Sequence, residues 1–250
     1  MTRIASHRGG TLESGDSTPS AFRMTAALPV DEVEFDLHPT ADGHIVVHHD
    51  PTLDRTTDRG GEIAMLTLAE VKSARLNHSP GEAPLTLPEL CAIFRPTPIA
   101  LRCEIKAGAD GLPYPGFADR VVAELKREGM LERTVFSSFL LEVAAALRPS
   151  LWLVSQPVLR QVGAAGVIAL ARTRSIAEIA VKVDLADAPL RDMVQAAGLE
   201  FGVYGAHSAA QIDHALALGV KVMTTDRPGL ALERRQNFPK VAVSDVQARI

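Results

Sequence analysis

Cysteine is scarce in this chain of 250 residues, which contains only Cys91 and Cys103. Two cysteines cannot build the disulfide framework of a small secreted domain, and their scarcity is typical of a reducing compartment. Residues 1–10 lack the charged n-region and the apolar h-region of a secretion signal. We therefore expect a cytoplasmic protein.

Aromatic residues, long apolar runs and excess charge are also missing. Aromatics make up 4% of the chain, which argues against a surface on which nucleic-acid bases stack. No apolar run approaches the ~18 residues of a membrane-spanning helix, so we expect no membrane insertion. The net charge is −4, from 26 basic and 30 acidic residues, and this balance favours neither nucleic acid nor an anionic membrane surface. The sequence carries no signal for an oligomeric state.

What the chain does contain is a repeated order of helix, glycine and short apolar strand. Residues 117–125, 190–197 and 208–216 carry apolar side chains at helical spacing, and each stretch is followed by a glycine. Such alternation favours parallel β/α units, in which helices cover the sheet. The eight candidate strands are residues 3–6, 33–38, 99–105, 134–136, 152–155, 180–183, 200–204 and 220–224. Eight strands in this length predict an α/β fold, the (β/α)8 TIM barrel.

One stretch interrupts this rhythm. Residues 50–98 are rich in turn signals and contain short helix-like pieces at residues 68–74 and 88–94. The stretch is too long for a simple loop between a strand and a helix. We therefore expect a single domain over residues 1–250, with a small insertion after the second strand that forms a lid or a substrate wall on the rim.

Carboxylates lie where the predicted strands end, which is the active-site end of such a barrel. Glu34 and Asp36 are two residues apart on one strand and face the same side, and Glu104 ends the next strand. Three carboxylates in one place form a hard-oxygen site for Mg²⁺, Ca²⁺ or Mn²⁺. The alternative is a salt-bridge network with Arg8 and Lys106, and the two interpretations are compatible. With a metal, both cations would contact a phosphoryl group.

Two histidines accompany this cluster. His7 follows the first strand, and His49 follows a predicted hairpin over residues 40–47. A pair of histidines at the barrel mouth can supply a general base and a general acid near neutral pH. His48 alternates with His49 and should face away. The remaining histidines have no such context and are interpreted as structural: His38, His44, His78, His207 and His214.

These motifs together strongly resemble the glycerophosphodiester phosphodiesterase family. The resemblance is carried by HRG at residues 7–9, EFDL at 34–37, GHIVVHHDPTLDRTT at 43–57, EIK at 104–106, SSF at 137–139 and TDRP at 225–228. It implies a TIM barrel with a small insertion and the hydrolysis of glycerophosphodiesters to glycerol 3-phosphate and an alcohol.

The resemblance also implies roles for residues. His7 and His49 would form the acid–base pair, and we expect His7 to be the base, although the sequence does not decide between them. The metal ligands would be Glu34, Asp36 and Glu104, and the phosphate would contact Arg8 and Lys106. The implied cofactor is a divalent metal, Mg²⁺ or Ca²⁺ with Mn²⁺ as a further option, and the implied partner is a small-molecule phosphodiester.

Two departures from the family pattern concern the substrate. The family's Pro-Glu-Asn-Thr is replaced by GDST at residues 15–18, where Asp16 takes the place of the glutamate and Glu13 is a rival. The family's Trp-Thr-Val-Asn is replaced by YGAH at residues 204–207, which leaves Tyr204 as a smaller aromatic wall. We assign Asp16 and Tyr204 to the substrate wall.

The departures leave other functions open. One alternative is a related phosphodiesterase that acts on a sugar or lysophospholipid diester and releases a cyclic phosphate. A non-catalytic binding barrel and a purely structural barrel are disfavoured, because both histidines and all three carboxylates are present.

Overall fold

Eight parallel strands close into a barrel in the computed structural model, which describes residues 1–239. In spatial order each strand pairs with the next, and the ring closes between the first two strands named here. The strands are β1 (Arg3–His7), β2 (Glu32–Pro39), β4 (Ala100–Ile105), β5 (Thr134–Ser138), β6 (Ser150–Val154), β7 (Glu178–Lys182), β8 (Glu200–Tyr204) and β9 (Val222–Thr225). The predicted TIM barrel is therefore confirmed.

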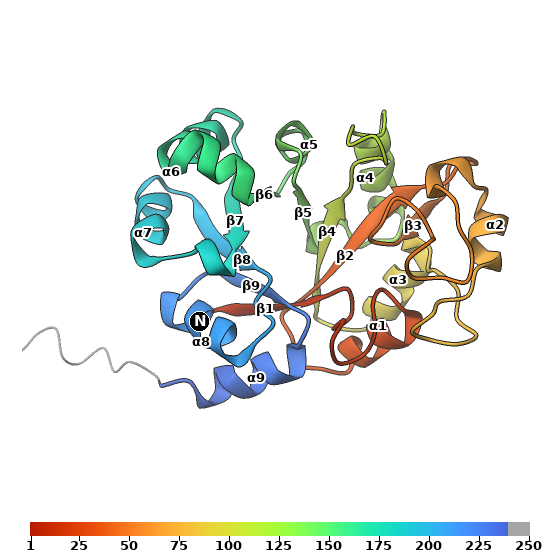
Figure 1. Cartoon of the computed structure of the whole chain (residues 1–250), viewed down its shortest axis with the longest axis horizontal. Coiled ribbons are helices and arrows are strands. Elements are labelled where there is room, and N and C mark those ends of the chain that lie inside the picture. Colours follow the sequence, from red (N-terminus) through yellow and green to blue (C-terminus); the bar gives the residue numbers. More distant parts are fainter. Residues whose placement is uncertain (240–250) are drawn as a thin grey trace, which may run out of the picture.

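Helices form a ring around these strands (Figure 1). They are α1 (Pro19–Ala26), α3 (Leu87–Phe94), α4 (Phe117–Arg127), α5 (Leu141–Ala146), α6 (Gln156–Thr173), α7 (Ala188–Ala196), α8 (Ala209–Leu218) and α9 (Pro228–Asn237). Short 3-10 turns lie at Leu131–Arg133 and Val183–Leu185. None of the helices within residues 1–239 has the length and apolar character to cross a membrane.

Helix α8 illustrates how local sequence sets these elements. The Ser208 hydroxyl accepts from the Gln211 backbone N–H, and Gln211 Oε1 accepts from the Ser208 backbone N–H, which makes a capping box. Ile212, Ala215 and Leu216 are buried on the face toward the barrel. Gly219 ends the helix at φ 62°, a left-handed conformation that favours glycine. The chain can therefore turn at Gly219 and enter strand β9 three residues later.

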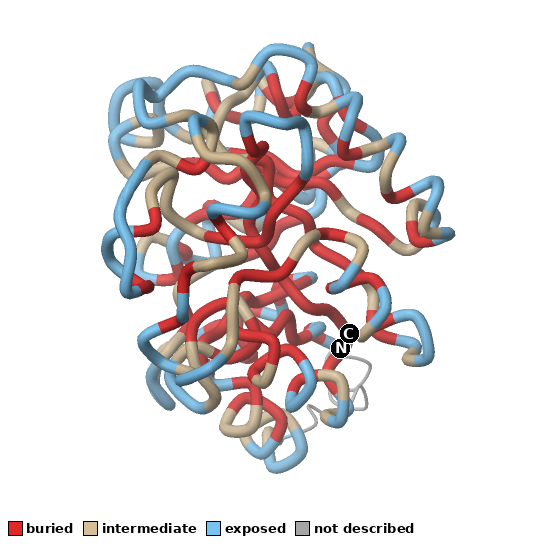
Figure 2. Tube along the Cα trace, turned by 90° about the vertical axis from the view of Figure 1, so that its right-hand side faces the viewer, coloured by how far each residue is buried: buried red, intermediate tan, exposed pale blue. Residues whose placement is uncertain are grey.

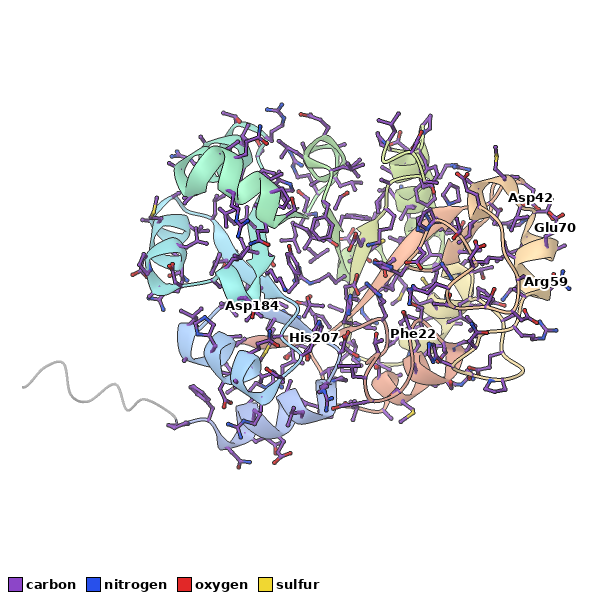
Figure 3. The ribbon with its side chains drawn as sticks, in the orientation of Figure 1. Phe22, Asp42, Arg59, Glu70, Asp184 and His207 are labelled. Carbon is purple, nitrogen blue, oxygen red and sulfur yellow. The ribbon has the colours of Figure 1, made fainter. Side chains whose placement is uncertain are left out.

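An insertion leaves the barrel after β2. Strand β3 (Ile45–Val47) pairs antiparallel with β2, and the chain then forms a 3-10 turn (Ile63–Met65) and helix α2 (Leu68–Ser73). Figure 1 shows this segment beside the barrel, and Figure 3 places Asp42, Arg59 and Glu70 at its outer edge. It has its own small buried cluster, formed by Val46, Leu53, Ile63, Val71 and Ala74.

Helix α3 belongs with the barrel helices. It lies between α1 and α4, and Leu87, Leu90 and Phe94 are part of the main core. The expected insertion over residues 50–98 therefore includes a helix that packs on the barrel. Burial concentrates on the strands and the inner helix faces, while exposed residues lie mainly on loops and outer helix faces (Figure 2).

Strand register decides which side chains meet inside the barrel. His7 lies beside Glu34, Asp36 lies beside Glu104, and Glu104 lies beside Ser137. Residues at matching positions of neighbouring strands point to the same face. The register therefore brings ionisable side chains from three strands to two adjacent levels at the carboxyl end of the barrel.

Candidate active site

A cavity of about 220 Å³ opens at the carboxyl ends of the strands. It is lined by most of the site residues predicted from the sequence, namely His7, Arg8, Glu34, His49, Glu104 and Lys106. Asp36 lies beneath them and is 0% exposed. The predicted residues, far apart in the sequence, are therefore neighbours in space.

The three carboxylates form a compact cluster. One oxygen atom from each of Glu34, Asp36 and Glu104 lies within 4.8 Å of the others, and all three residues are buried. Within residues 1–239, Glu34 Oε2 has no hydrogen-bond donor, whereas the two carboxylate oxygens of Asp36 have cations at 3.0 and 3.1 Å without hydrogen-bond geometry. Buried oxygens without donors are costly unless a cation satisfies them. The donor set, all oxygen, fits a hard divalent cation such as Mg²⁺, Ca²⁺ or Mn²⁺.

Burial, mutual repulsion and the neighbouring cations all shift the pKa values of these carboxyl groups. Burial, together with the charge of Asp36, raises the pKa of Glu34 to about 8. Burial also raises the pKa of Glu104 against the opposing effect of Lys106. Burial would raise the pKa of Asp36 too, but Lys106 and Arg8 outweigh it and lower that pKa. The protein's own cations therefore stabilise the charge of Asp36, and further positive charge would be stabilising beside the other two.

Arg8 and Lys106 flank the cluster. Lys106 Nζ lies 2.6 Å from Glu104 Oε1 and 3.0 Å from Asp36 Oδ1. Arg8 Nε lies 3.1 Å from Asp36 Oδ2, without hydrogen-bond geometry. Arg8 has φ 51°, a strained conformation for a residue with a side chain, and its N–H is fixed by the Glu34 carbonyl at 2.9 Å. Gly9 follows with φ 85°, and a Cβ there would lie 2.9 Å from Ala21 Cβ. The loop therefore packs tightly on α1 and holds Arg8 in place.

His7 is held by a carboxylate from the other end of the chain. Its Nδ1 is hydrogen-bonded to Asp226 Oδ1, while its Nε2 lies 3.7 Å from Glu34 Oε2. Burial alone would lower the pKa of His7, but Glu34 and the hydrogen bond with Asp226 outweigh it and raise that pKa. The Asp226 backbone N–H donates to His207 Nδ1 at 3.1 Å. This bond fixes His207 as an acceptor at Nδ1, so its ring proton stands on Nε2.

His49 has a matching arrangement. Its Nδ1 lies 2.5 Å from Asp50 Oδ1, and Arg55 Nε donates to the other oxygen of Asp50 at 2.5 Å. The pKa of His49 is lowered, first by burial, which outweighs the opposing charge of Asp36. The His38 ring bonds the His49 carbonyl at 3.1 Å. Hydrogen bonds therefore fix both the ring and the backbone carbonyl of His49. Its Nε2 atom remains available to the cavity.

His48 faces away from the cavity. It is buried in the insertion, where its Nδ1 bonds the Asp50 carbonyl at 2.8 Å and its Nε2 bonds the Thr56 hydroxyl at 2.7 Å.

The two residues expected in the substrate wall have different positions. Tyr204 lines the cavity, with its hydroxyl donating to the Val154 carbonyl at 3.2 Å, and its ring packs edge-on against Phe139. Asp16 is only 5% exposed and lies behind Arg8 at 3.5 Å. Its carboxylate is paired with Arg8 and Arg55, and its assignment to the substrate wall stays a prediction.

Sequence reasoning missed Asp226 and His207. His207 was interpreted as structural, yet it lines the cavity, and its ring centroid lies 6.1 Å from that of His7. Figure 3 shows it toward the centre of the barrel. A signal existed, because Asp226 directly follows β9 and His207 lies three residues after β8, the position that drew attention to the earlier strands.

The fold and the site define a TIM barrel whose mouth carries a buried carboxylate cluster, two supported histidines and two cations. The family model described as "Glycerophosphoryl diester phosphodiesterase family" matches residues 7–230. The chain belongs to this family, and the resemblance seen in the sequence is confirmed.

Known proteins agree with this membership. A crystal structure from Agrobacterium tumefaciens str. C58, described as "Putative glycerophosphoryl diester phosphodiesterase", is 59% identical with a TM-score of 0.94 and covers 95% of this chain and 98% of that one. A glycerophosphodiester phosphodiesterase of Caldanaerobacter subterraneus is 34% identical over 143 residues, which span 55% of this chain and 58% of that relative. An Oleispira antarctica phosphodiesterase, solved with the product sn-glycerol-3-phosphate, shares the fold at 21% identity, with a TM-score of 0.79 over 94% of this chain and 97% of that one.

Proposed function

We propose that this protein hydrolyses glycerophosphodiesters to glycerol 3-phosphate and an alcohol, with a divalent metal and two catalytic histidines. The observation that carries the proposal is the carboxylate cluster, enclosed in one cavity with His7, His49, Arg8 and Lys106. Family membership supports the reaction class, and the glycerol 3-phosphate in the Oleispira antarctica structure supports the product.

Glu34, Asp36 and Glu104 would hold the metal, because one buried oxygen of each lies within 4.8 Å of the others and Glu34 Oε2 has no hydrogen-bond donor among the described residues. A bound divalent ion acts as a Lewis acid on a phosphoryl oxygen. Arg8 and Lys106 supply fixed positive charge beside the same position. They bind the phosphate and stabilise the charge that develops on its oxygens during displacement.

His7 and His49 move the protons. His7 takes the proton of the attacking oxygen, from water or from the 2-hydroxyl of the glycerol arm, and Asp226 stabilises the imidazolium that forms. His49 acts from its doubly protonated form, in which Nδ1–H stays hydrogen-bonded to Asp50 and the Nε2 proton passes to the oxygen of the departing alcohol; the lowered pKa of His49 makes that proton easier to release. In the metal-free protein, the negative charge of Glu34 makes the largest contribution to raising the pKa of His7. Positive charge bound at Glu34 removes that contribution and leaves His7 available as a base.

One assay tests this function. Glycerophosphocholine, glycerophosphoethanolamine, glycerophosphoinositol and a sugar phosphodiester are each offered with Mg²⁺, Ca²⁺, Mn²⁺ or EDTA, and the products are identified by phosphorus NMR. We expect glycerol 3-phosphate from the glycerol esters with at least one metal and none with EDTA. Turnover undiminished by EDTA after dialysis contradicts the metal role. A cyclic phosphate as the end product, or activity confined to the sugar diester, favours the alternative phosphodiesterase.

A histidine variant completes the assay. His49→Ala should lower kcat by about 10²–10⁴-fold while metal affinity holds, because one acid–base group supplies a factor of that size. His44→Ala is the matched control, since its side chain is 54% exposed and lies outside the cavity. Near-normal turnover by His49→Ala would remove His49 from the mechanism.

A further inference from the structure

A second cavity of about 250 Å³ adjoins the first at the barrel mouth. The two cavities share His49, Glu104, Lys106 and Phe139. His7 lines only the first. The shared wall therefore contains one of the two histidines and one of the two phosphate cations.

The far wall of the second cavity is compact and mainly apolar. Pro51, Ile105, Ala107 and Leu140 contribute to it, from the segment after β3 and from the ends of β4 and β5. Its remaining carboxylate, Asp50, is already engaged by Arg55 and His49. His38 also borders the cavity, and both of its ring nitrogens are already engaged, Nδ1 with the Tyr114 hydroxyl at 2.9 Å and Nε2 with the His49 carbonyl at 3.1 Å.

A cation is poorly accommodated there. The face of Phe139 would be the natural place for an ammonium group to stack. Lys106 Nζ already lies 6.0 Å from the centroid of that ring. The charge of Lys106 would repel a second cation at this position. Asp50 does not offset the repulsion, because it is already paired with Arg55.

A phosphodiester has two ester arms on one phosphorus atom, and this geometry matches two cavities that diverge from one wall. Displacement at phosphorus places the attacking and leaving oxygens on opposite sides. The surface of the first cavity is also mainly apolar, but it carries His7, Arg8 and His207, whose N–H groups can bind the hydroxyls of a glycerol arm. The second cavity suits the other arm.

We propose that the second cavity is the subsite for the departing alcohol, and that it selects a compact, uncharged alcohol over a cationic one. This inference rests on the proposed function. In the step, the attacking oxygen forms a new bond to phosphorus and yields its proton to His7. The bond from phosphorus to the alcohol oxygen breaks, and that oxygen takes the Nε2 proton of His49, which is the histidine that the subsite shares.

Three synthetic esters of glycerol 3-phosphate test the subsite: the methyl, 1-propyl and 2-aminoethyl esters. The propyl and aminoethyl groups have nearly the same shape and differ in charge. We expect kcat/KM for the propyl ester to exceed that for the methyl ester by about tenfold, because two more CH₂ groups are buried. We expect it to exceed that for the aminoethyl ester at least tenfold, although the aminoethyl alcohol is the better leaving group.

Two variants locate the effect. Ala107→Phe fills the cavity and should lower the propyl-to-methyl ratio of kcat/KM at least fivefold, while Leu140→Ala enlarges it and should raise kcat/KM for a butyl ester relative to propyl. The matched control is Ala210→Phe, which adds the same volume on the exposed side of α8. It should leave every ratio unchanged.

The outcomes separate the two proposals. If no ester yields glycerol 3-phosphate with any metal, the proposed function fails. If the esters are hydrolysed but the aminoethyl ester matches or exceeds the propyl ester, the assignment of an uncharged alcohol is overturned. If Ala107→Phe and Leu140→Ala both leave the ratios as in the parent protein, the departing alcohol does not occupy this cavity.

Discussion

At the scale of single residues, Asp226 contacts two histidines of the site. It hydrogen-bonds His7 through its side chain, its backbone N–H donates to His207, and its Oδ2 lies 3.2 Å from His207 Nδ1. A carboxylate behind a catalytic histidine fixes the ring's orientation and stabilises its charged form. We infer that Asp226 and His207 are positioning residues for His7.

This inference predicts a graded loss of turnover. Asp226→Asn should lower kcat by about 10²-fold or more with little change in KM, since the stabilising charge on His7 disappears. His207→Asn should lower kcat about fivefold, because a single hydrogen bond is worth about 1 kcal/mol. Steady-state kinetics with the 1-propyl ester of glycerol 3-phosphate measure both. His44→Asn, on an exposed residue, is the control. Equal effects on kcat and KM in both variants, together with lost stability, would indicate a merely structural role.

The acidic residues at strand ends could be predicted from the sequence. Glu34, Asp36 and Glu104 could be placed together because alternation along a strand and the common edge of parallel strands are general rules. Asp16 could not be placed this way. Its assignment to the substrate wall came from a family pattern, and only the packing shows that it is buried behind Arg8.

At the scale of elements, sequence periodicity predicted those helices that bury one clear face. Helices α4, α7 and α8 bury regularly spaced apolar residues. Helix α6 buries only Val167 and Ala171 and is broken at Gly163, which has φ 69°. A helix with so little buried surface carries a weak periodic signal. The sequence also offered no means to tell that α3 packs on the barrel while α2 belongs to the insertion.

We propose that the insertion and the barrel form one cooperative domain. Strand β3 continues the barrel sheet, and the Val47 N–H donates to the Leu85 carbonyl where the insertion returns. Leu53→Ala, in the insertion's small core, should lower the free energy of unfolding by about 2–5 kcal/mol. Denaturant unfolding, followed by circular dichroism and by Trp152 fluorescence, should give coincident transitions. A separate early transition in the variant would show that the insertion unfolds on its own.

At the scale of the whole molecule, an ion network occupies the barrel interior below the site. Arg102 is 2% exposed, and its guanidinium lies 2.7 Å from Glu32 Oε2 and 3.1 Å from Glu178 Oε1. Arg102 on β4 therefore links β2 and β7 through Glu32 and Glu178. Its side chain also lines the cavity, and its charge is already paired with these two carboxylates.

Breaking this network should cost stability. Glu178→Ala leaves a buried guanidinium with one partner fewer and should lower the free energy of unfolding by about 3–5 kcal/mol. Glu200→Ala is the matched control, because Glu200 lies 3.9 Å from Lys221 at the surface, and such exposed pairs contribute about 0–1 kcal/mol. Urea unfolding of both variants measures the difference. Similar small losses in the two would mean that the interior pair adds no more than a surface pair.

The sequence by itself determined the barrel, the family and the set of ionisable residues at the strand ends, because each depends on local spacing along single elements. The tertiary structure decided which distant residues meet. Asp226 is 219 residues from His7 and reaches it only because β9 closes the ring against β1. The burial of Asp16 and the two cavities that share His49 likewise depend on how loops from several strands pack together. Local spacing carries no information about such contacts, since they arise from closure of the barrel.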